Sequence, residues 1–328
     1  MKPADIEVLS RAQGCLLGQL AGDALGSLVE FRTPEDIQRE HPGGVRDLVD
    51  GGTWNTIAGQ PTDDSEMALA LARMLADQGR YDPKDARRVY VLWLDSSPFD
   101  CGMTVSSGLR GRTNPDSQAN GAMMRISPLG IFGANHEVEQ VVEWARQDAA
   151  LTHPHVVCQQ ANMLFAAAIA QVIRSGGGAG DLYRQIVTWA EAMNVEDTLM
   201  EAITGAATAP PAGYVHQQGW VLTAFRNALW QLLNAPNLEE GVVNTVMCGG
   251  DTDTNSAICG ALLGAVYGRN AIPDRWVGRL LNCRAAAGQS NVQRPRPECF
   301  WPVDALELAE RLIQSSQQDK LQGEVNES

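Results

Sequence analysis

Residues 248–268 read CGGDTDTNSAICGALLGAVYG, and this stretch joins two opposite kinds of chemistry. Its first half places Asp251 and Asp253 one residue apart, behind two glycines and among hydroxyl side chains. Its second half is a run of small and apolar residues that predicts a buried helix. Carboxylates at the mouth of a buried helix are costly unless a partner compensates their charge. In the helical half, glycine recurs at every fourth position: Gly260, Gly264 and Gly268.

A matching stripe lies near the N-terminus, where the same spacing recurs at Gly14, Gly18, Gly22 and Gly26. Glycine inside a helix costs about 1 kcal/mol relative to alanine, so these positions need a reason. A glycine stripe lets another backbone approach closely, as it does between membrane helices, but charged side chains on the first helix argue against a membrane span. We predict that the striped helices pack antiparallel, which would bring Glu30 to Asp251 and Asp253. The alternative is that each stripe contacts a different neighbour.

The rest of the chain has helical periodicity nearly throughout and no convincing strand. Because no change in composition marks a boundary, we predict one all-α domain over residues 1–317 and a polar tail over 318–328. The spacing of apolar residues and of Gly, Pro and Asn predicts helices over 5–26, 64–78, 83–95, 102–111, 121–134, 136–150, 156–174, 180–193, 196–207, 219–234, 238–247, 254–268, 273–281 and 303–317.

Composition narrows the range of partners. The formal net charge is -14, from 25 basic and 39 acidic residues. Such a surface repels nucleic acid and anionic membranes, so we expect neither as a partner. The seven cysteines follow no disulfide or zinc spacing, and no signal-peptide pattern is present. We therefore expect reduced, mostly buried thiols in a cytoplasmic protein, and we leave the oligomeric state open, with a monomer as one alternative.

A second acidic cluster lies in PTDDSEMALALA, residues 61–72, where Asp63 and Asp64 open an amphipathic helix. One interpretation is helix capping: Asp63 and Glu66 fit a capping box, and acidic residues favour the first helical turn. The same interpretation applies to Asp253 or Thr254 at the start of the buried helix. It does not explain why Asp251, Asp253 and Thr254 occur together beside so apolar a helix.

Metal binding explains both clusters. Mg²⁺ and Mn²⁺ prefer oxygen ligands in an octahedral arrangement, and two ions about 4 Å apart would compensate the repulsion among four carboxylates. An EF-hand matches only at its first three ligand positions, because Ser256 replaces the glycine at position six and Leu262 the glutamate at position twelve. Zinc is disfavoured, since neither His nor Cys clusters with these acids.

Five motifs occur in order along the chain: GCLLGQLAGDALGSLVEF, PTDDSEMALALA, NGAMMRISPLGIF, LTHPH and GGDTDTNSAICGALLGAVYG. Together they resemble the ADP-ribosylglycohydrolase family over residues 11–270. The resemblance implies an orthogonal bundle of a dozen or more helices with a centre of two Mg²⁺ or Mn²⁺ ions. It also implies cleavage of the bond between the anomeric ribose carbon of ADP-ribose and an acceptor, on a protein or a small molecule.

The resemblance assigns roles to individual residues. Glu30 corresponds to an acidic residue that approaches the metals, with an ordinary helix-end glutamate as the alternative. The metal ligands that it implies are Thr62, Asp63, Asp64, Asp251, Asp253 and Thr254. The substrate-binding residues that it implies, in a loop before a helix N-terminus and in LTHPH, are Ser117, Asn120, Gly121, Met124 and His153. The alternatives are a plain Asx-rich turn for the loop and a structural histidine.

The resemblance also guides the choice of acceptor. Asp100, in SSPFDCGMT, corresponds to an aspartate of the enzymes that release ADP-ribose from arginine, where a carboxylate would face the leaving guanidinium. Its alternative role is to cap the helix predicted at 102–111. We therefore predict an ADP-ribosylarginine hydrolase with Asp63, Glu30 and Asp100 as catalytic residues. Two alternatives stay open: an enzyme for serine-linked or small-molecule ADP-ribose, and a non-catalytic ADP-ribose reader or crystallin-like protein.

Overall fold

The computed structural model describes the backbone of residues 3–326 and the side chains of residues 5–316. Within these residues the fold is entirely helical, with no strand beyond two isolated bridges, so the predicted all-α class is confirmed. The α-helices are α1 (Pro3–Gly26), α2 (Pro34–Glu40), α3 (Asp63–Gln78), α4 (Pro83–Asp95), α5 (Met103–Leu109), α6 (Ser127–Phe132), α7 (Val138–Ala150), α8 (Val156–Ser175), α9 (Ala179–Ala192), α10 (Asp197–Gly205), α11 (Val221–Asn234), α12 (Leu238–Val246), α13 (Thr252–Tyr267), α14 (Asp274–Asn282) and α15 (Ala305–Asn326).

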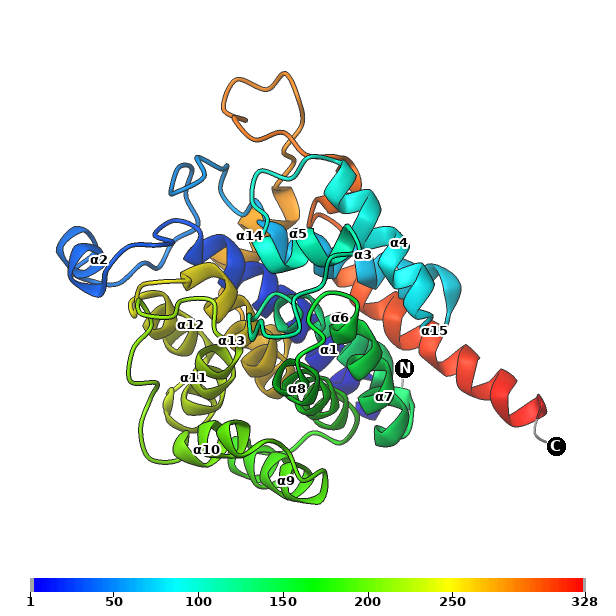
Figure 1. The fold of residues 1–328 in the computed structure, drawn as a ribbon. Coiled ribbons are helices and arrows are strands. Elements are labelled where there is room, and N and C mark those ends of the chain that lie inside the picture. Colours follow the sequence, from blue (N-terminus) through cyan, green and yellow to red (C-terminus); the bar gives the residue numbers. More distant parts are fainter. Residues whose placement is uncertain (1–2, 327–328) are drawn as a thin grey trace.

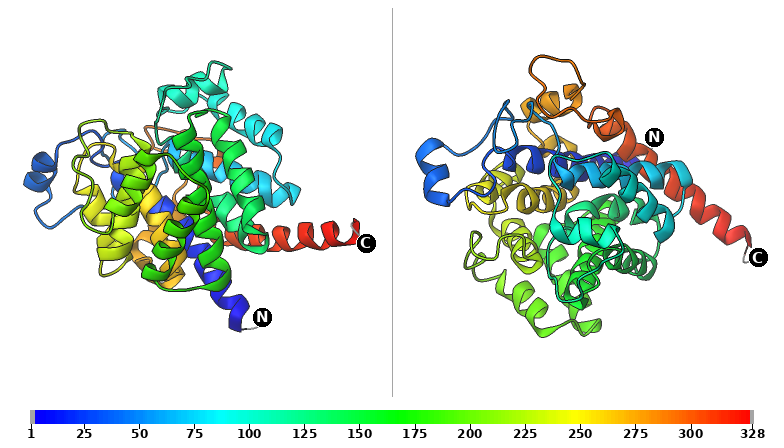
Figure 2. Two further views of the ribbon diagram at one scale, coloured as in Figure 1. Left: turned by 60° about the horizontal axis from the view of Figure 1, so that its bottom comes forward. Right: turned by 45° about the horizontal axis from the view of Figure 1, so that its top comes forward.

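The two glycine-striped helices form the centre of the bundle (Figures 1 and 2). A Cβ atom added to Gly18 would lie 2.1 Å from the carbonyl oxygen of Gly260, and one added to Gly264 would lie 2.0 Å from that of Gly14. Contacts run from Gly14 against the C-terminal end of α13 to Gly26 against its first turn, so α1 and α13 are antiparallel. The predicted pairing of the two stripes is confirmed.

The antiparallel pair brings the end of α1 to the start of α13. Beyond α1, the amide of Phe31 donates to the carbonyl of Gly250 at 2.7 Å, and the amide of Gly250 donates to the carbonyl of Arg32 at 2.9 Å. Gly249 and Gly250 both have positive φ, which explains the two glycines ahead of the acidic cluster. Glu30 therefore lies beside the carboxylates of the α13 motif, as predicted.

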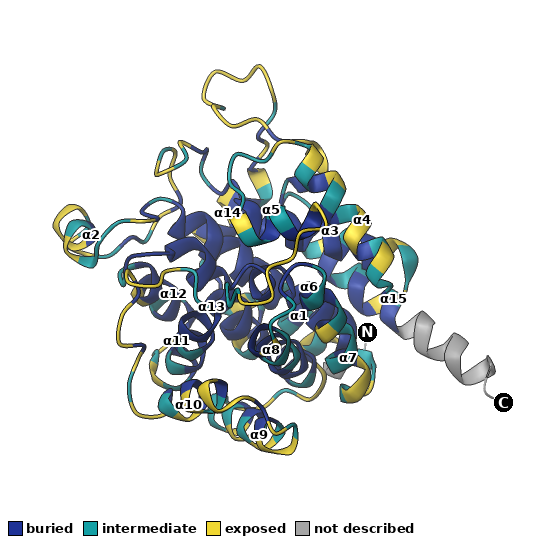
Figure 3. Cartoon of the chain, in the orientation of Figure 1, coloured by how far each residue is buried: buried dark blue, intermediate teal, exposed yellow. Residues whose placement is uncertain are grey.

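Helix α8 is the most apolar of the surrounding helices. Its length and hydropathy would allow a membrane span, but 72% of that window is buried inside the protein. A core helix of a globular domain has the same composition, and α8 packs against α7, α6 and α13. Figure 3 shows α8 and the α1–α13 pair as the buried middle of the fold.

Three helix predictions were wrong. Helix α2 was missed, although Thr33 as its N-cap and Pro34 in its first turn are recognisable start signals. The helix predicted at 121–134 is divided into a 3-10 turn at Met123–Arg125, α6 and a second 3-10 turn, with Pro128 in the first turn of α6. Helix α15 runs to Asn326 and not to the predicted end at 317, while residues 327–328 lie outside the described part; the division into a domain and a polar tail stays a prediction.

Candidate active site

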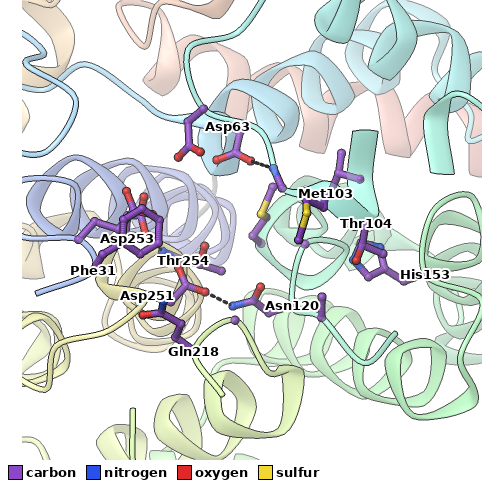
Figure 4. Close-up of a pocket in the computed structure, with 18 residues that line it drawn as sticks. Phe31, Asp63, Met103, Thr104, Asn120, His153, Gln218, Asp251, Asp253 and Thr254 are labelled. Carbon is purple, nitrogen blue, oxygen red and sulfur yellow. Dashed lines mark hydrogen bonds between the residues drawn. The ribbon is translucent and has the colours of Figure 1, made fainter. Parts of the chain in front are cut away.

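The acidic motifs face a cavity of about 260 Å³ near the meeting point of α1, α3 and α13 (Figure 4). No described residue that lines it is Lys or Arg. Of the residues predicted for the site, those that line the cavity are Glu30, Asp63, Asp100, Asn120, Gly121, Met124, His153, Asp251, Asp253 and Thr254. The lining residues not predicted are Phe31, Gly102, Met103, Thr104, Val105, Ala119, Gln218 and Gly219.

Carboxylate oxygens gather here in two groups. Asp23, Asp64 and Asp253 each offer an oxygen within 4.8 Å of the others, and Glu30, Asp251 and Asp253 do the same. All five side chains are buried, and Asp253 belongs to both groups. Helices α3 and α13 are in contact, and Asp64 in the first turn of α3 lies beside Asp253 in the first turn of α13. The structure thus brings both sequence clusters into one centre.

Asp23 was not predicted as a site residue. Its carboxylate accepts hydrogen bonds from the amide of Thr62 at 3.1 Å, from the hydroxyl of Thr62 at 2.8 Å and from the amide of Ser65 at 3.0 Å. It therefore caps α3 from another helix, with its lone pairs directed at the donors of the first turn. A charged residue beside Gly22 within a close-packed stripe was the signal in the sequence that could have identified it.

The capping box predicted for α3 is wrong, although Asp63, Asp64 and Glu66 do lie in its first turn, as the interpretation from the helix dipole expects. Thr62 holds the N-cap position without a side-chain capping bond, and no capping box forms between Asp63 and Glu66. Glu66 instead accepts from Trp93 Nε1 at 2.8 Å and forms a buried ion pair with Arg296 at 2.7 Å. Asp63 is left facing the cavity, where it accepts a long hydrogen bond from the amide of Gly102 at 3.4 Å.

The first turn of α13, like that of α3, has no capping bond from the side chain of its own N-cap residue. Asp251, rather than Asp253 or Thr254, is the N-cap residue, and its side chain makes no capping bond. Instead, Asp251 Oδ2 accepts from Asn120 Nδ2 at 2.7 Å across the cavity (Figure 4). Asp253 accepts the amide of the next residue, Thr254, through Oδ1 at 2.9 Å. Local capping therefore does not account for the carboxylates of α13.

Burial and mutual repulsion raise the pKa values of these acids. Burial, followed by Asp100 and Asp251, raises the pKa of Glu30 to about 8. Burial raises the pKa of Asp100 to about 6, and burial likewise raises that of Asp23 to about 6. The pKa values of the other buried acids, Asp63, Asp64 and Asp253, lie well above the ordinary range for the same reasons.

The residues of this centre fit hard divalent cations. Asp64 Oδ1 is buried without a hydrogen-bond partner, although its other oxygen accepts from the hydroxyl of Thr62 at 3.2 Å. An unpartnered buried carboxylate oxygen is costly, and a cation would satisfy it. The ligand atoms on offer are carboxylate and hydroxyl oxygens. Such a set suits Mg²⁺ and Mn²⁺ better than it suits Zn²⁺, which binds His and Cys as well. The carboxylate oxygens of Asp23 already accept hydrogen bonds from the first turn of α3. We therefore expect Asp23 to hold the metal-binding residues of α3 in place and not to bind metal itself.

The remaining predicted residues lie on the other sides of the cavity. Figure 4 shows His153 across the cavity from Asp251 and Asp253, with Asn120 between them. A Cβ atom on Gly121 would lie 2.8 Å from Val105 and 3.2 Å from the His153 ring, so any larger residue there would require these side chains to shift. Ser117 does not line the cavity; its hydroxyl contacts that of Thr104 at 2.9 Å from behind.

Asp100 lines the cavity, and the Trp54 ring lies beside another lining residue, Glu30. Helix α5 has Gly102 as its N-cap, without a side-chain capping bond, so the capping alternative for Asp100 is wrong. The Asp100 carboxylate instead lies near Asp63, where burial, followed by the negative charge of Asp100, raises the pKa of Asp63. Trp54 donates from Nε1 to Glu30 at 2.5 Å and contacts two further rings, Phe31 and Phe99, with centroid separations of 6.5 and 6.0 Å.

Comparison with known proteins places this site in a family. The sequence profile of the ADP-ribosylglycohydrolase family matches residues 4–321, nearly the whole chain. The chain belongs to the ADP-ribosylglycohydrolase family. A solved structure described as an ADP-ribosylglycohydrolase-related protein complex has the same fold, with a TM-score of 0.78, 27% identity, and coverage of 95% of this chain and 99% of that one.

The names of two similar proteins indicate the reaction class. The chain is 31% identical over 283 residues to the ADP-ribosyl-(dinitrogen reductase) glycohydrolase of Rhodospirillum rubrum, covering 83% of this chain and 91% of the relative. It is 26% identical over 324 residues to an ADP-ribosylarginine hydrolase of Pseudomonas putida (strain GB-1), covering 94% and 82%. The predicted family and hydrolase class are confirmed.

The acidic centre of this ADP-ribosylglycohydrolase predicts an inverted pH dependence of stability without metal. Glu30, Asp100 and Asp23 have higher pKa values when folded than when unfolded, so the folded state binds more protons between about pH 4 and pH 8. Stability of the chelated protein should therefore fall as pH rises through that window. We expect its melting temperature to drop by about 5 °C or more between pH 5.5 and pH 8, taking roughly 2–4 °C per kcal/mol.

Adding excess Mg²⁺ or Mn²⁺ should remove most of this loss, because the cations compensate the ionised carboxylates. Scanning calorimetry at both pH values, with metal and with chelator, measures the effect. A chelated protein that becomes more stable towards pH 8, or a metal effect equal at both pH values, would contradict the raised pKa values. Citrate and phosphate should be avoided as buffers, because they bind divalent cations.

Proposed function

We propose that this protein hydrolyses ADP-ribosylated arginine on proteins, cleaving the bond at the anomeric carbon of the ribose. The observation that supports this most directly is one cavity lined by Glu30, Asp251 and Asp253, which form one carboxylate cluster, with Asp63 and Asp100 on the same cavity. Behind it, Asp253 also belongs to the cluster of the buried Asp23 and Asp64. The names of two relatives, a dinitrogen reductase glycohydrolase and an ADP-ribosylarginine hydrolase, support the same reaction. A cytoplasmic location is part of the proposal.

We propose that the centre holds two divalent ions, Mg²⁺ or Mn²⁺. The ligands would be the residues that the sequence predicts: Thr62, Asp63, Asp64, Asp251, Asp253 and Thr254. Asp253 is suited to serve both positions because it belongs to both carboxylate groups. When bound, such ions supply positive charge that polarises sugar hydroxyls and water.

The side chains around the cavity divide the remaining tasks. Breaking the glycosidic bond builds positive charge on the ribose, which the surrounding carboxylates stabilise. Glu30 and Asp63 lie where a carboxylate can take a proton from the attacking water. Asn120 and Gly121 form the wall along which the ribose and diphosphate would lie. Asp100 would face the leaving guanidinium through charge-assisted hydrogen bonds.

The choice of arginine depends on Asp100. Among the described residues that line the cavity there are five carboxylates and no Lys or Arg, so a cationic acceptor would meet negative charge without a competing cationic side chain. Arginine suits such a site because its guanidinium only donates hydrogen bonds and stacks on rings. A serine hydroxyl as leaving group gains much less from the charge of Asp100.

Substituting Asp100→Asn tests this choice. We expect kcat/KM for arginine-linked ADP-ribose to fall by about 10²-fold, since a hydrogen bond to a charged group contributes roughly 1.5–3 kcal/mol. For a serine-linked peptide of the same sequence, the change should stay within about threefold. Release of ADP-ribose from both peptides, with and without chelator, measures the difference. Asp95→Asn, at the exposed end of α4, is the matched control.

The two substrates also separate the open alternatives. Faster release from the serine-linked peptide by the wild-type protein would refute the arginine assignment while keeping the hydrolase. Equal losses on both peptides in Asp100→Asn would show that Asp100 acts on the ribose and not on the acceptor. Binding of ADP-ribose without metal-dependent turnover on either peptide would favour the non-catalytic reader.

A further inference from the structure

A fully buried polar network lies behind the wall of the cavity opposite the acidic centre. Arg125 and Asp148 have no exposed surface and form an ion pair, with Arg125 Nε 3.0 Å from Asp148 Oδ1. Arg125 Nη2 also donates to the main-chain carbonyl of Asp148 at 2.9 Å. Two tyrosine hydroxyls, of Tyr81 and Tyr90, donate to Asp148 Oδ2 at 3.4 and 3.0 Å. The carboxylate and the carbonyl of Asp148 therefore fix the orientation of the Arg125 guanidinium.

The third arm of the guanidinium points towards the cavity. Arg125 Nη1 donates to the hydroxyl of Thr152 at 2.9 Å. That hydroxyl lies 2.8 Å from Nδ1 of the next residue, His153, whose ring lines the cavity. Both Thr152 and His153 are completely buried within the protein. His153 Nε2, the far ring nitrogen, has no hydrogen-bond partner among the described residues.

The direction of each hydrogen bond follows from the chemistry of the groups. A guanidinium can only donate, so the Thr152 oxygen accepts from Arg125. The single hydroxyl proton of Thr152 then needs an acceptor, and His153 Nδ1 is the one within hydrogen-bond distance. If Nδ1 donated instead, the Thr152 proton would be buried without a partner, which is unfavourable. Nδ1 is therefore the acceptor.

The proton of a neutral imidazole must then lie on Nε2, which faces the cavity. Burial, followed by the positive charge of Arg125, lowers the pKa of His153 to about 3, so the ring is neutral at ordinary pH. Gly121 keeps the approach to this ring open, since a Cβ atom there would lie 3.3 Å from Nε2. The unpartnered atom is thus an N–H donor directed at the substrate side of the cavity.

We infer that Arg125 and Thr152 are positioning residues that fix His153 as the Nε2–H tautomer, so that it donates a hydrogen bond to an oxygen of the bound ADP-ribose. The ligand chemistry is an oxygen acceptor of the diphosphate or ribose. The ligand part of this inference depends on the proposed function, whereas the tautomer does not. Neither Arg125 nor Thr152 touches the cavity, so both act through His153.

The tautomer can be measured directly in the ligand-free protein. Nitrogen-15 NMR of protein labelled in the histidine rings distinguishes protonated from unprotonated ring nitrogens. We expect a single His153 form with a pyridine-type Nδ1 and a pyrrole-type Nε2, assigned by comparison with His153→Gln. Thr152→Ser should keep this pattern, and Thr152→Val should lose it. A protonated Nδ1 in the wild type, or an unchanged pattern in Thr152→Val, would overturn the inference.

Binding of ADP-ribose tests the consequence. Thr152→Val should raise the Kd for ADP-ribose by about tenfold, the change expected from losing one hydrogen bond. Thr152→Ser should change this Kd by no more than about twofold. In a His153→Ala background, Thr152→Val should cause no further loss, because its effect passes through the ring. Equal losses in both backgrounds would show a merely structural role and overturn the inference.

The two readouts separate this inference from the proposed function. If wild-type protein fails to bind ADP-ribose but shows the expected nitrogen pattern, the proposed function fails and the positioning of His153 stands. If it binds and turns over ADP-ribosylated substrate but Nδ1 carries the proton, the proposed function stands and the positioning role fails. Thermal melting of each variant excludes unfolding, and Thr152→Ser remains informative if Thr152→Val does not fold.

Discussion

Replacing Asp253 by asparagine is expected to lower kcat/KM for release of ADP-ribose by about 10³-fold or more, with no loss of fold. Asp253 is the one described side chain that belongs to both carboxylate groups, so its removal weakens both proposed metal positions. Asparagine keeps an oxygen that can accept from the amide of Thr254, so the first turn of α13 should stay intact. The loss should therefore come from charge and not from geometry.

Titration calorimetry with Mn²⁺ should show the cause. The wild type is expected to bind two ions, and Asp253→Asn should bind with lower stoichiometry or much weaker affinity. Without metal, the variant should melt at a higher temperature than the wild type at pH 8, because one carboxylate fewer is repelled by Glu30 and Asp64. Asp274→Asn, an exposed position in α14 with a side chain 98% accessible, is the control for removing one negative charge.

Full activity in Asp253→Asn, measured with saturating metal, would falsify the binuclear centre. A different failure is also informative. If activity is lost but metal-free stability falls, then Asp253 supports the helix start rather than a metal, and the local explanation rejected above would be correct after all. The two measurements together distinguish a ligand from a structural carboxylate, which neither can do alone.

The parts of the site that sequence reasoning could predict are those with a local signature. The glycine stripes have a period, the acidic motifs have a spacing, and both depend on neighbours along the chain. From these alone, the approach of Glu30 to the α13 motif could be deduced, and it is present. Asp100 could be placed near the site only through the family resemblance, since its segment has no periodicity.

The missed residues depend on contacts between distant segments. Asp23 caps α3, 39 residues further along the chain; its place beside Gly22 marks it as an unusual charge, but the sequence of its own helix does not name its partner. Trp54 reaches Glu30 from a turn-rich segment without periodicity. The link between Arg125 and His153 runs through Thr152, whose neighbours in sequence suggested only a helix end. Tertiary hydrogen bonds of this kind have no sequence period, so only the structure shows them.

The second large effect is expected from Gly18→Ala, a change of one methyl group in the middle of α1. The added Cβ would lie 2.1 Å from the carbonyl oxygen of Gly260 and 2.8 Å from its carbonyl carbon. Both are backbone atoms, so no side chain can rotate away, and the helices must separate. We expect a loss of about 4 kcal/mol or more in unfolding free energy, at the upper end for single substitutions.

Activity of Gly18→Ala should fall as well, because the contact of α1 with α13 helps to set the separation of Glu30 and Asp253. Denaturant unfolding and steady-state kinetics, both with excess metal, measure the two effects. Gly278→Ala is the matched control, since Gly278 is also helical but a Cβ atom there would meet nothing within 4 Å. It should leave stability unchanged or raise it by roughly 0.5–1 kcal/mol. If both substitutions gave the same result, helix propensity rather than close packing would explain the stripes, and the central helix pair would not be what positions the acidic centre.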